Sequence, residues 1–335
     1  MTKRFDDHVW RRDLGRAVIV SAALLVGCGG GSSSTEPPPP PPAPPPADER
    51  VLPDTIDVGE LLEQVKADMP RRDSDDYRPP TPDQRIAMVG ILEDARAGRI
   101  VRADSLAELY GYNVEAAVEA GHGDSVVVMI ERAPIQRGWG TYIVRKGARA
   151  ADVHVNHPLF DTNTPAVAAE LYDACRCRAL LMAGTHRYAN GGDESDMARA
   201  TGSVFQGVHE VLAVDAEMVV SVHGFARDNY DEPIGSADAV LSLGADAQGA
   251  LAANDDARAL RDSLRNAGFV AGLIADDADY TQLTGSPNPQ GRHSNAEFGH
   301  GRWIHIELAR EVRTEQDAYE LLTGLVAAWL ADVVS

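Results

Sequence analysis

Residues 218–224 read Met218-Val-Val-Ser-Val-His-Gly224, a mostly apolar run followed at once by an imidazole and a glycine. A short apolar run without polar alternation is typical of a strand buried on both faces of a sheet. Similar runs lie at 179–182, 269–274 and 303–308, and helical patterns separate them. Strands alternating with helices predict an α/β fold, with a mixed, mostly parallel sheet flanked by helices. The expected helices are 164–174, 196–212, 255–267 and 315–334, with further strands at 125–131, 141–145 and 152–156.

The segment before this alternation has a different character. Residues 57–69 and 82–96 carry the periodicity of amphipathic helices, and prolines interrupt the chain between them. We therefore expect a helical N-terminal extension over 51–120, followed by an α/β catalytic domain at 121–335. Residues 276–301 form a long polar stretch and are expected to be a functional loop.

The first fifty residues have the pattern of an export signal and a tether. Basic residues precede an apolar run at 17–27 that is too short to span a bilayer core, which needs about 20 residues. The run ends Leu25-Val-Gly-Cys28 and resembles the lipobox of bacterial lipoproteins, in which the cysteine becomes the acylated N-terminus. Arg11-Arg12 also resembles a twin-arginine export signal. We expect a signal peptide over 1–27, lipid on Cys28, and a Gly/Ser/Pro-rich tether over 28–50.

Lipid on Cys28 would place the protein in the cell envelope, anchored to a membrane and exposed outside the cytoplasm. The formal charge of −20 disfavours binding to nucleic acid, because the phosphate backbone is also anionic. The remaining cysteines, Cys175 and Cys177, are too near each other for a disulfide framework. We expect two packing residues there, with a redox-labile pair as the alternative.

Polar side chains collect where the predicted strands end, which is where open α/β sheets bind ligands. His157 and Asp161 follow one strand with a spacing that lets both reach a single ion, and His223 ends another. Imidazole and carboxylate suit Zn²⁺, and a catalytic zinc takes three protein ligands and keeps one position open. These three residues are therefore the predicted zinc ligands. His154 competes with His157, since strand alternation would place the two on opposite faces.

Other polar residues near these strand ends are candidates for catalysis and substrate binding. Glu307 is a carboxylate on an otherwise apolar strand and is expected to take a proton from water activated by the metal. Arg187 is expected to steady an oxyanion or a substrate carboxylate. Arg292, Arg227 and His186 are expected to assist in substrate binding.

Each of these residues also has a purely structural interpretation. A single histidine at a strand end is commonly a hydrogen-bonded core residue, and Asp161 could be an ordinary helix N-cap. Glu307 could pair with Arg310 or Arg313 on the surface.

Three short motifs together resemble the zinc-dependent carboxypeptidase-like hydrolases, nearest the N-formylglutamate amidohydrolase and poly-γ-glutamate hydrolase branches. They are Asp161-Thr-Asn-Thr164 leading into a helix, Met218 to Gly224, and Ile304-His-Ile-Glu-Leu308 with Arg310 downstream. The resemblance implies a mixed-sheet α/β fold, one zinc and hydrolysis of an amide. It also implies Asp161, His223 and His157 as ligands and Glu307 as the base.

The chain departs from that pattern at its first ligand. Carboxypeptidases use His-x-x-Glu, whereas this chain has His157-x-x-x-Asp161, and Pro158-Leu-Phe stands where the poly-γ-glutamate branch is Gly-rich. The first ligand thus remains open between His157 and His154, and so does the substrate.

We therefore expect a lipid-anchored, zinc-dependent hydrolase of a small-molecule or peptide amide, including acyl-amino acids. The alternative is a non-catalytic substrate-binding lipoprotein with a hydrolase-like fold. A metal phosphoesterase is disfavoured by too few acidic ligands. A serine hydrolase is disfavoured because the sequence holds no Gly-x-Ser-x-Gly motif.

Overall fold

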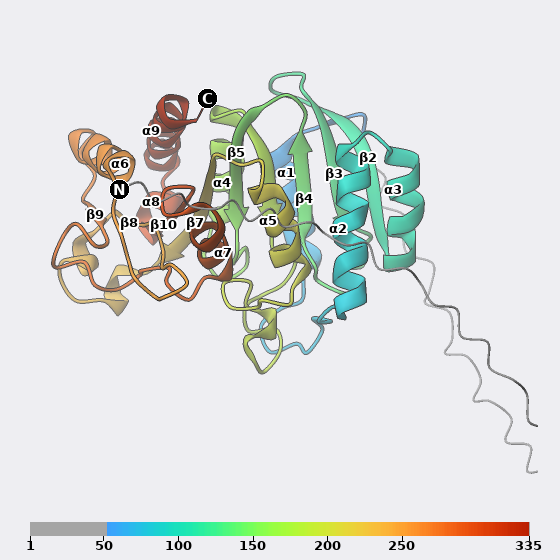
Figure 1. The fold of residues 1–335 in the computed structure, drawn as a ribbon, viewed down its shortest axis with the longest axis horizontal. Coiled ribbons are helices and arrows are strands. Elements are labelled where there is room, and N and C mark those ends of the chain that lie inside the picture. Colours follow the sequence, from blue (N-terminus) through green and yellow to red (C-terminus); the bar gives the residue numbers. More distant parts are fainter. Residues whose placement is uncertain (1–51, 335) are drawn as a thin grey trace, which may run out of the picture. The chain divides into compact units, whose positions relative to one another are not determined.

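One mixed sheet of ten strands organises the computed structural model, which describes residues 52–334 (Figure 1). The strand order is β1-β2-β3-β4-β6-β5-β7-β10-β8-β9, and the four central strands β6, β5, β7 and β10 run parallel. The predicted α/β fold is confirmed. The strands are β1 (Thr55–Ile56), β2 (Tyr112–Glu119), β3 (Ser125–Glu131), β4 (Thr141–Arg145), β5 (Arg149–Val155), β6 (Cys177–Met182), β7 (Met218–Phe225), β8 (Ala239–Ser242), β9 (Ala271–Leu273) and β10 (Trp303–Ala309).

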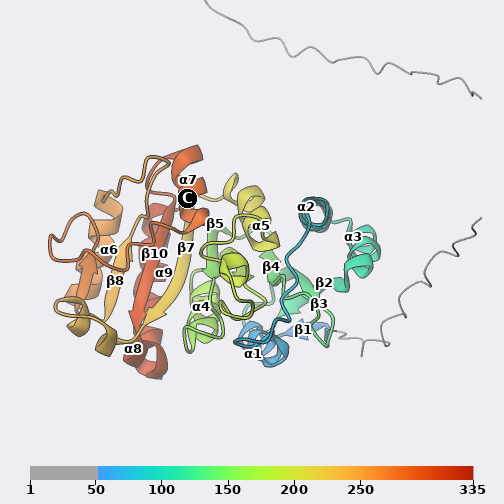
Figure 2. The same cartoon turned by 90° about the horizontal axis from the view of Figure 1, so that it is seen from below.

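Helices cover both faces of this sheet. The helices α2, α3, α5 and α7 lie on one side of the strands, and α1 and α4 lie on the other (Figure 2). The helices are α1 (Val58–Asp68), α2 (Pro82–Arg96), α3 (Ile100–Ala107), α4 (Thr164–Ala174), α5 (Val204–Ala213), α6 (Asp255–Asn266), α7 (Pro289–Phe298), α8 (Arg310–Thr314) and α9 (Gln316–Val333). None of the helices in residues 52–334 is both long and apolar enough to cross a bilayer.

Local sequence explains where several helices begin. Thr81 caps α2 in a capping box with Gln84, and Pro82 occupies the first turn, where a missing N–H costs nothing. Asn288 caps α7 by accepting from the backbone N–H groups of Gln290 and Gly291, and Pro289 occupies the first turn. These caps satisfy backbone N–H groups that the helix itself leaves unpaired.

The central strands have one apolar face and one polar face. From Met218 to Gly224 of β7 and from Trp303 to Leu308 of β10, the even-numbered residues face the main hydrophobic core on the α4 side, whereas the odd-numbered ones face the side of α5 and α7 (Figure 2). At the strand ends, Phe225 and Ala309 also belong to the main core. Ser221, His223, His305 and Glu307 all belong to that second set, since paired residues of parallel strands point the same way. The chemistry predicted for the strand ends therefore lies on the α5/α7 face.

Several segments differ from the sequence prediction. The extension predicted as helical also contributes β2, which pairs with β3, so this segment is part of the sheet. The polar stretch 276–301 contains α7, whose cap and proline are visible in the sequence. Helix α5 begins at Val204 rather than 196, because Asp196 and its neighbours form turns that its carboxylate stabilises. The short strand β8, at 239–242, was not predicted.

The expectation of free cysteines is wrong, because Cys175 and Cys177 form a disulfide between the end of α4 and the start of β6. Both residues are buried. The predicted signal peptide, the tether and Cys28 lie outside the described residues, and those predictions stand as made.

Candidate metal centre

Three adjacent strands of the sheet, β5, β7 and β10, bring the predicted metal ligands together. His157 and Asp161 lie in the turn that follows β5, and His223 lies near the end of β7. Glu307 on β10 is the register partner of His223, so the two side chains stand next to each other on the same face. The parallel arrangement thus places residues that are far apart in sequence at one edge.

The three predicted ligands form a compact and buried group. Asp161 Oδ2 lies 3.2 Å from His157 Nδ1 and 3.4 Å from His223 Nδ1. One ligand atom from each residue lies within 4.8 Å of the others. Each of the three residues is no more than 3% exposed. This spacing is compatible with a single small cation held between two imidazoles and a carboxylate.

Each imidazole is oriented by a partner on its far nitrogen. His157 Nε2 lies 2.8 Å from Asp196 Oδ1, and His223 Nε2 lies 3.1 Å from Ser221 Oγ. The Nδ1 atoms of both rings therefore face Asp161. A hydrogen bond on the far nitrogen fixes the tautomer and the ring orientation of a metal-binding histidine. Neither Asp196 nor Ser221 was found from the sequence.

The competing residue His154 lies elsewhere. Strand β5 ends at Val155, so His154 is inside the strand and fully buried, whereas His157 is beyond its end. The ring of His154 packs 5.2 Å from that of His209, and within residues 52–334 it belongs to neither of the two ligand groups. Burial, and then the nearby charge of His223, lowers the pKa of His154 to about 3.

The charges in this group are tightly coupled. Burial disfavours the charged form of His157, but the carboxylates of Asp161 and Asp196 outweigh it and raise the pKa of His157 to about 9. Burial would raise the pKa of Asp161, yet His157 and His223 hold that pKa below its usual range. Burial, then His305, lowers the pKa of His223 to about 4. Without a metal, the site thus holds one protonated and one neutral imidazole at neutral pH.

Glu307 has a single hydrogen-bonding partner. Its Oε1 lies 3.0 Å from His305 Nε2, whereas its buried Oε2 has no partner among the described residues. His305 stacks on Trp303, with ring centroids 5.6 Å apart. It also completes a second candidate ligand group with His223 and Glu307. The sequence showed His305 beside Glu307 but gave no reason to assign it a role.

The structural interpretation of Glu307 as a surface partner of arginine does not fit. Glu307 is 9% exposed, and its carboxylate is hydrogen-bonded to His305. Arg313 is itself buried and donates to the backbone carbonyls of Leu308 and Phe225.

Arg187 and His186 lie beside the predicted ligands. Arg187 Nη2 lies 2.6 Å from Asp196 Oδ2, so this guanidinium is tied to the carboxylate that orients His157. Its Cζ also lies 5.1 Å from the ring centroid of Phe160, and the ring of His186 lies 5.8 Å from the same ring. Together with Tyr188, these residues form a partly exposed aromatic and cationic rim next to the ligand group.

Arg227 and Arg292 have partners away from this group. Arg227 pairs with Asp238 and donates to the carbonyl of Ala237, and Arg292 donates to the carbonyl of Ser286. Within residues 52–334, no hydrogen bond or ion pair joins either arginine to the predicted ligands. Their role in substrate binding stays a prediction.

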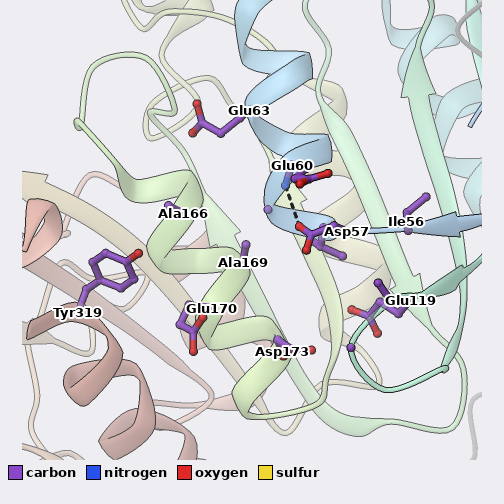
Figure 3. A pocket seen from close by; sticks show the side chains of 14 residues that line it. Ile56, Asp57, Glu60, Glu63, Glu119, Ala166, Ala169, Glu170, Asp173 and Tyr319 are labelled. Atoms are coloured by element: carbon purple, nitrogen blue, oxygen red, sulfur yellow. Dashed lines mark hydrogen bonds between the residues drawn. The ribbon is translucent and has the colours of Figure 1, made fainter. Parts of the chain in front are cut away.

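A separate pocket of about 450 Å³ lies between α1 and α4 and is not the metal centre (Figure 3). It is lined by acidic side chains, among them Asp57, Glu60 and Glu170, and by Tyr319 from α9. Its lining residues include no histidine, and several of its carboxylates already have partners: Asp57 caps α1, Glu119 pairs with Arg145 and Glu63 pairs with Lys66.

Comparison with known proteins finds similarity in structure only. The sequence matches no protein-family profile and no characterised protein. Similar solved structures include the gene product Atu2144 from Agrobacterium tumefaciens (11% identity, TM-score 0.38, 55% of this chain and 89% of that one). They also include a bacteriophage poly-γ-glutamate hydrolase (13%, 0.37, 57% and 89%) and a carboxypeptidase A from Shewanella denitrificans (11%, 0.34, 67% and 66%).

These matches include the kinds of protein that the sequence motifs resemble. With TM-scores between 0.34 and 0.38, these structures say nothing about the function of this chain.

Proposed function

We propose that this protein is a zinc-dependent hydrolase of an amide bond, of the peptide or acyl-amino-acid type. The observation that carries the proposal is the convergence of His157 Nδ1, His223 Nδ1 and Asp161 Oδ2 in a buried site. A catalytic zinc site has three protein ligands of this kind and leaves a position free.

The donor set fits zinc in its chemistry as well as its spacing. In both imidazoles Nδ1 can bind a metal without its proton, because Asp196 and Ser221 are hydrogen-bonded to the other nitrogen. His157 must lose a proton before it can bind a metal, so zinc and protons compete for this residue. Zinc held there would act as a Lewis acid and make a coordinated water more acidic.

Glu307 is the proposed general base. Its Oε1 is engaged by His305 while Oε2 stays uncommitted within the protein, so one oxygen can accept a proton and pass it to a leaving amine. Arg187 is proposed to hold a substrate carboxylate or steady an oxyanion, although its pairing with Asp196 reduces its free charge. Phe160 and Tyr188 would offer apolar contact beside it.

We further propose that Cys28 carries lipid and anchors the protein to a membrane, exposed outside the cytoplasm. This part rests on the sequence alone. Its test is a Cys28→Ala variant, which should move from the membrane fraction to the soluble fraction. A variant that stays with the membrane would contradict the anchor.

The metal content of the full-length protein, purified in detergent, tests the hydrolase. We expect about one zinc per chain in the wild type, as in other catalytic zinc sites, and loss of that zinc in His223→Ala. His122→Ala is the matched control, since His122 is exposed and pairs with Asp173, away from the predicted ligands. Absence of zinc from the wild type, even after zinc is supplied at neutral pH, would favour a non-catalytic binding lipoprotein.

A further inference from the structure

A chain of buried hydrogen bonds runs from the metal centre to the surface between α2 and α5. Its members, in order, are His223, Ser221, Asn156, Gln290, Gln206, Glu210 and Arg85. The successive donor–acceptor distances from His223 to Glu210 are 3.1, 2.9, 2.8, 2.8 and 3.0 Å. The four members between His223 and Glu210 are at most 3% exposed. Each of these polar groups would destabilise the fold if it were buried without a partner, so a long buried series of them points to a role beyond packing.

The outer end of the chain fixes the direction of every bond in it. Glu210 is a carboxylate paired with Arg85, so it can only accept, and Gln206 must turn its amide N–H toward Glu210. The oxygen of Gln206 then accepts from the amide of Gln290. The oxygen of Gln290 in turn accepts from Asn156.

The inner end follows by the same logic. The side-chain oxygen of Asn156 is left to accept the hydroxyl proton of Ser221. Ser221 Oγ, having donated its only proton, must accept, and the remaining neighbour is His223 Nε2. These bonds therefore place the proton of a neutral His223 on Nε2, which leaves Nδ1 free to bind a metal. In metal-free protein the Asp161 carboxylate, 3.4 Å from Nδ1, competes for that proton.

A backbone carbonyl prevents these hydrogen bonds from reversing their direction. The second N–H of Gln290 donates to the carbonyl of Met197 at 3.1 Å, and that carbonyl can only accept. If the amide of Gln290 flipped, its oxygen would face the Met197 carbonyl and the oxygen of Gln206. Two independent acceptors, Glu210 and Met197, therefore impose the same orientation.

We infer that Ser221, Asn156 and Gln290 are positioning residues that set the tautomer of His223, directed by the Met197 carbonyl and, through Gln206, by the Glu210 carboxylate. The two histidine ligands are thus oriented in different ways. On Nε2, His157 meets the Asp196 carboxylate directly, whereas His223 is connected to a carboxylate through four uncharged side chains. The consequence for metal binding rests on the zinc site proposed above, but the tautomer itself does not.

Zinc affinity is the first test, measured by competition with a chromogenic chelator on full-length protein in detergent. Ser221→Ala should weaken zinc binding by about 10–100-fold, the usual effect of removing the partner that orients a histidine ligand. Gln290→Met should weaken it in the same direction, because it removes the acceptor of Asn156 together with both bonds that fix the Gln290 amide. Its control is Gln316→Met, because Gln316 donates to Glu320 at the exposed start of α9. Unchanged affinity in both Ser221→Ala and Gln290→Met would overturn the inference.

The second test needs no metal and remains decisive if Ser221→Ala fails to fold. In metal-free wild-type protein, ¹⁵N NMR of the histidine side chains should show His223 as the Nε2–H tautomer, with its signal identified by its loss in His223→Gln. Gln290→Met should populate the other tautomer, and Gln316→Met should not. A wild-type His223 protonated on Nδ1 would refute the inference. Protein that shows the expected tautomer but binds no zinc would refute the proposed function alone.

Discussion

Replacing Asp196 by asparagine removes one charge from the centre without changing the volume of the side chain. Asp196 Oδ1 accepts from His157 Nε2 at 2.8 Å and from the backbone N–H of Ala198 at 3.0 Å, and Oδ2 accepts from Arg187 at 2.6 Å. An asparagine has a single acceptor oxygen, so its amide N–H groups would face either the imidazole or the guanidinium. Neither orientation satisfies both donors. His157 would then lose its orienting partner, or Arg187 would lose its carboxylate.

The size of the effect follows from the kind of bond that is lost. A hydrogen bond to a charged group is worth about 1.5–3 kcal/mol, and about 1.4 kcal/mol corresponds to a factor of ten in an equilibrium constant. We therefore expect the Kd for zinc to rise by about 10–100-fold in Asp196→Asn, the range typical of such partners of metal-binding histidines. The pKa of His157 should also fall from about 9, since Asp196 is one of the two carboxylates that raise it.

Chelator competition measures the Kd, and thermal unfolding of the metal-free protein reports whether the variant is folded. Asp193→Asn is the matched control, because Asp193 is 77% exposed and meets Arg199 only at 4.0 Å. The reasoning is refuted if folded Asp196→Asn binds zinc as tightly as the wild type. It is also refuted if Asp193→Asn weakens binding equally.

Three further predictions concern catalysis, pH and stability. Glu307→Gln should keep its zinc and lose about 10²–10⁴-fold in turnover of any amide that the wild type hydrolyses, so retained activity would exclude Glu307 as the base. Burial, and then the nearby His154, keeps the pKa of His209 well below its usual value of about 6.5. As the pH falls, His209 is therefore protonated in the unfolded chain before it is protonated in the folded protein. Stability should thus decline below about pH 6.5, and in His209→Gln the decline between pH 6 and 5 should be smaller by about 1.4 kcal/mol per pH unit, as measured by urea unfolding. Glu119→Gln should destabilise the protein by about 1.5–3 kcal/mol, because it removes the nearest carboxylate of the buried Arg145 and leaves Asp124 and Asp173 at 3.6 and 3.9 Å. Arg176→Gln, which breaks an exposed pair, should cost about 1 kcal/mol or less in the same assay.

The sequence was sufficient to predict the central sheet because β6, β7 and β10 are continuous apolar runs, each followed or interrupted by a polar residue. It was also sufficient to predict His157, Asp161 and His223 as one group, since parallel strands end at the same edge. Strand β2 was missed although its polar and apolar residues alternate, as is typical of a half-buried strand. The helical periodicity of the preceding residues led to the expectation of helices throughout this segment.

The residues that orient the ligands could not be predicted in the same way. Asp196 reaches His157 across 39 residues from a turn that interrupts a helical pattern, so its position depends on the tertiary fold. Gln290 reaches Asn156 across 134 residues from a helix inside a stretch that reads as a polar loop. Only α7 had a local signal, the Asn-Pro pair that begins it. Hydrogen bonds between distant side chains leave no periodic pattern in the sequence.

One face of β7 and β10 contributes to the stability of the fold, and the other carries the residues of the candidate site. Val220, Val222 and Ile306 pack into the main core on one face, and His223 and Glu307 stand on the other. A shift of one residue in either strand would turn the valines and isoleucine toward the polar face and move the ligand into the core. The apolar residues therefore hold the register that places His223 opposite Glu307, although they take no part in the chemistry. Substitutions that enlarge or shrink these apolar side chains should alter zinc affinity only as far as they alter the register. Substitution of Ser221, on the polar face, should alter zinc affinity while the register stays intact.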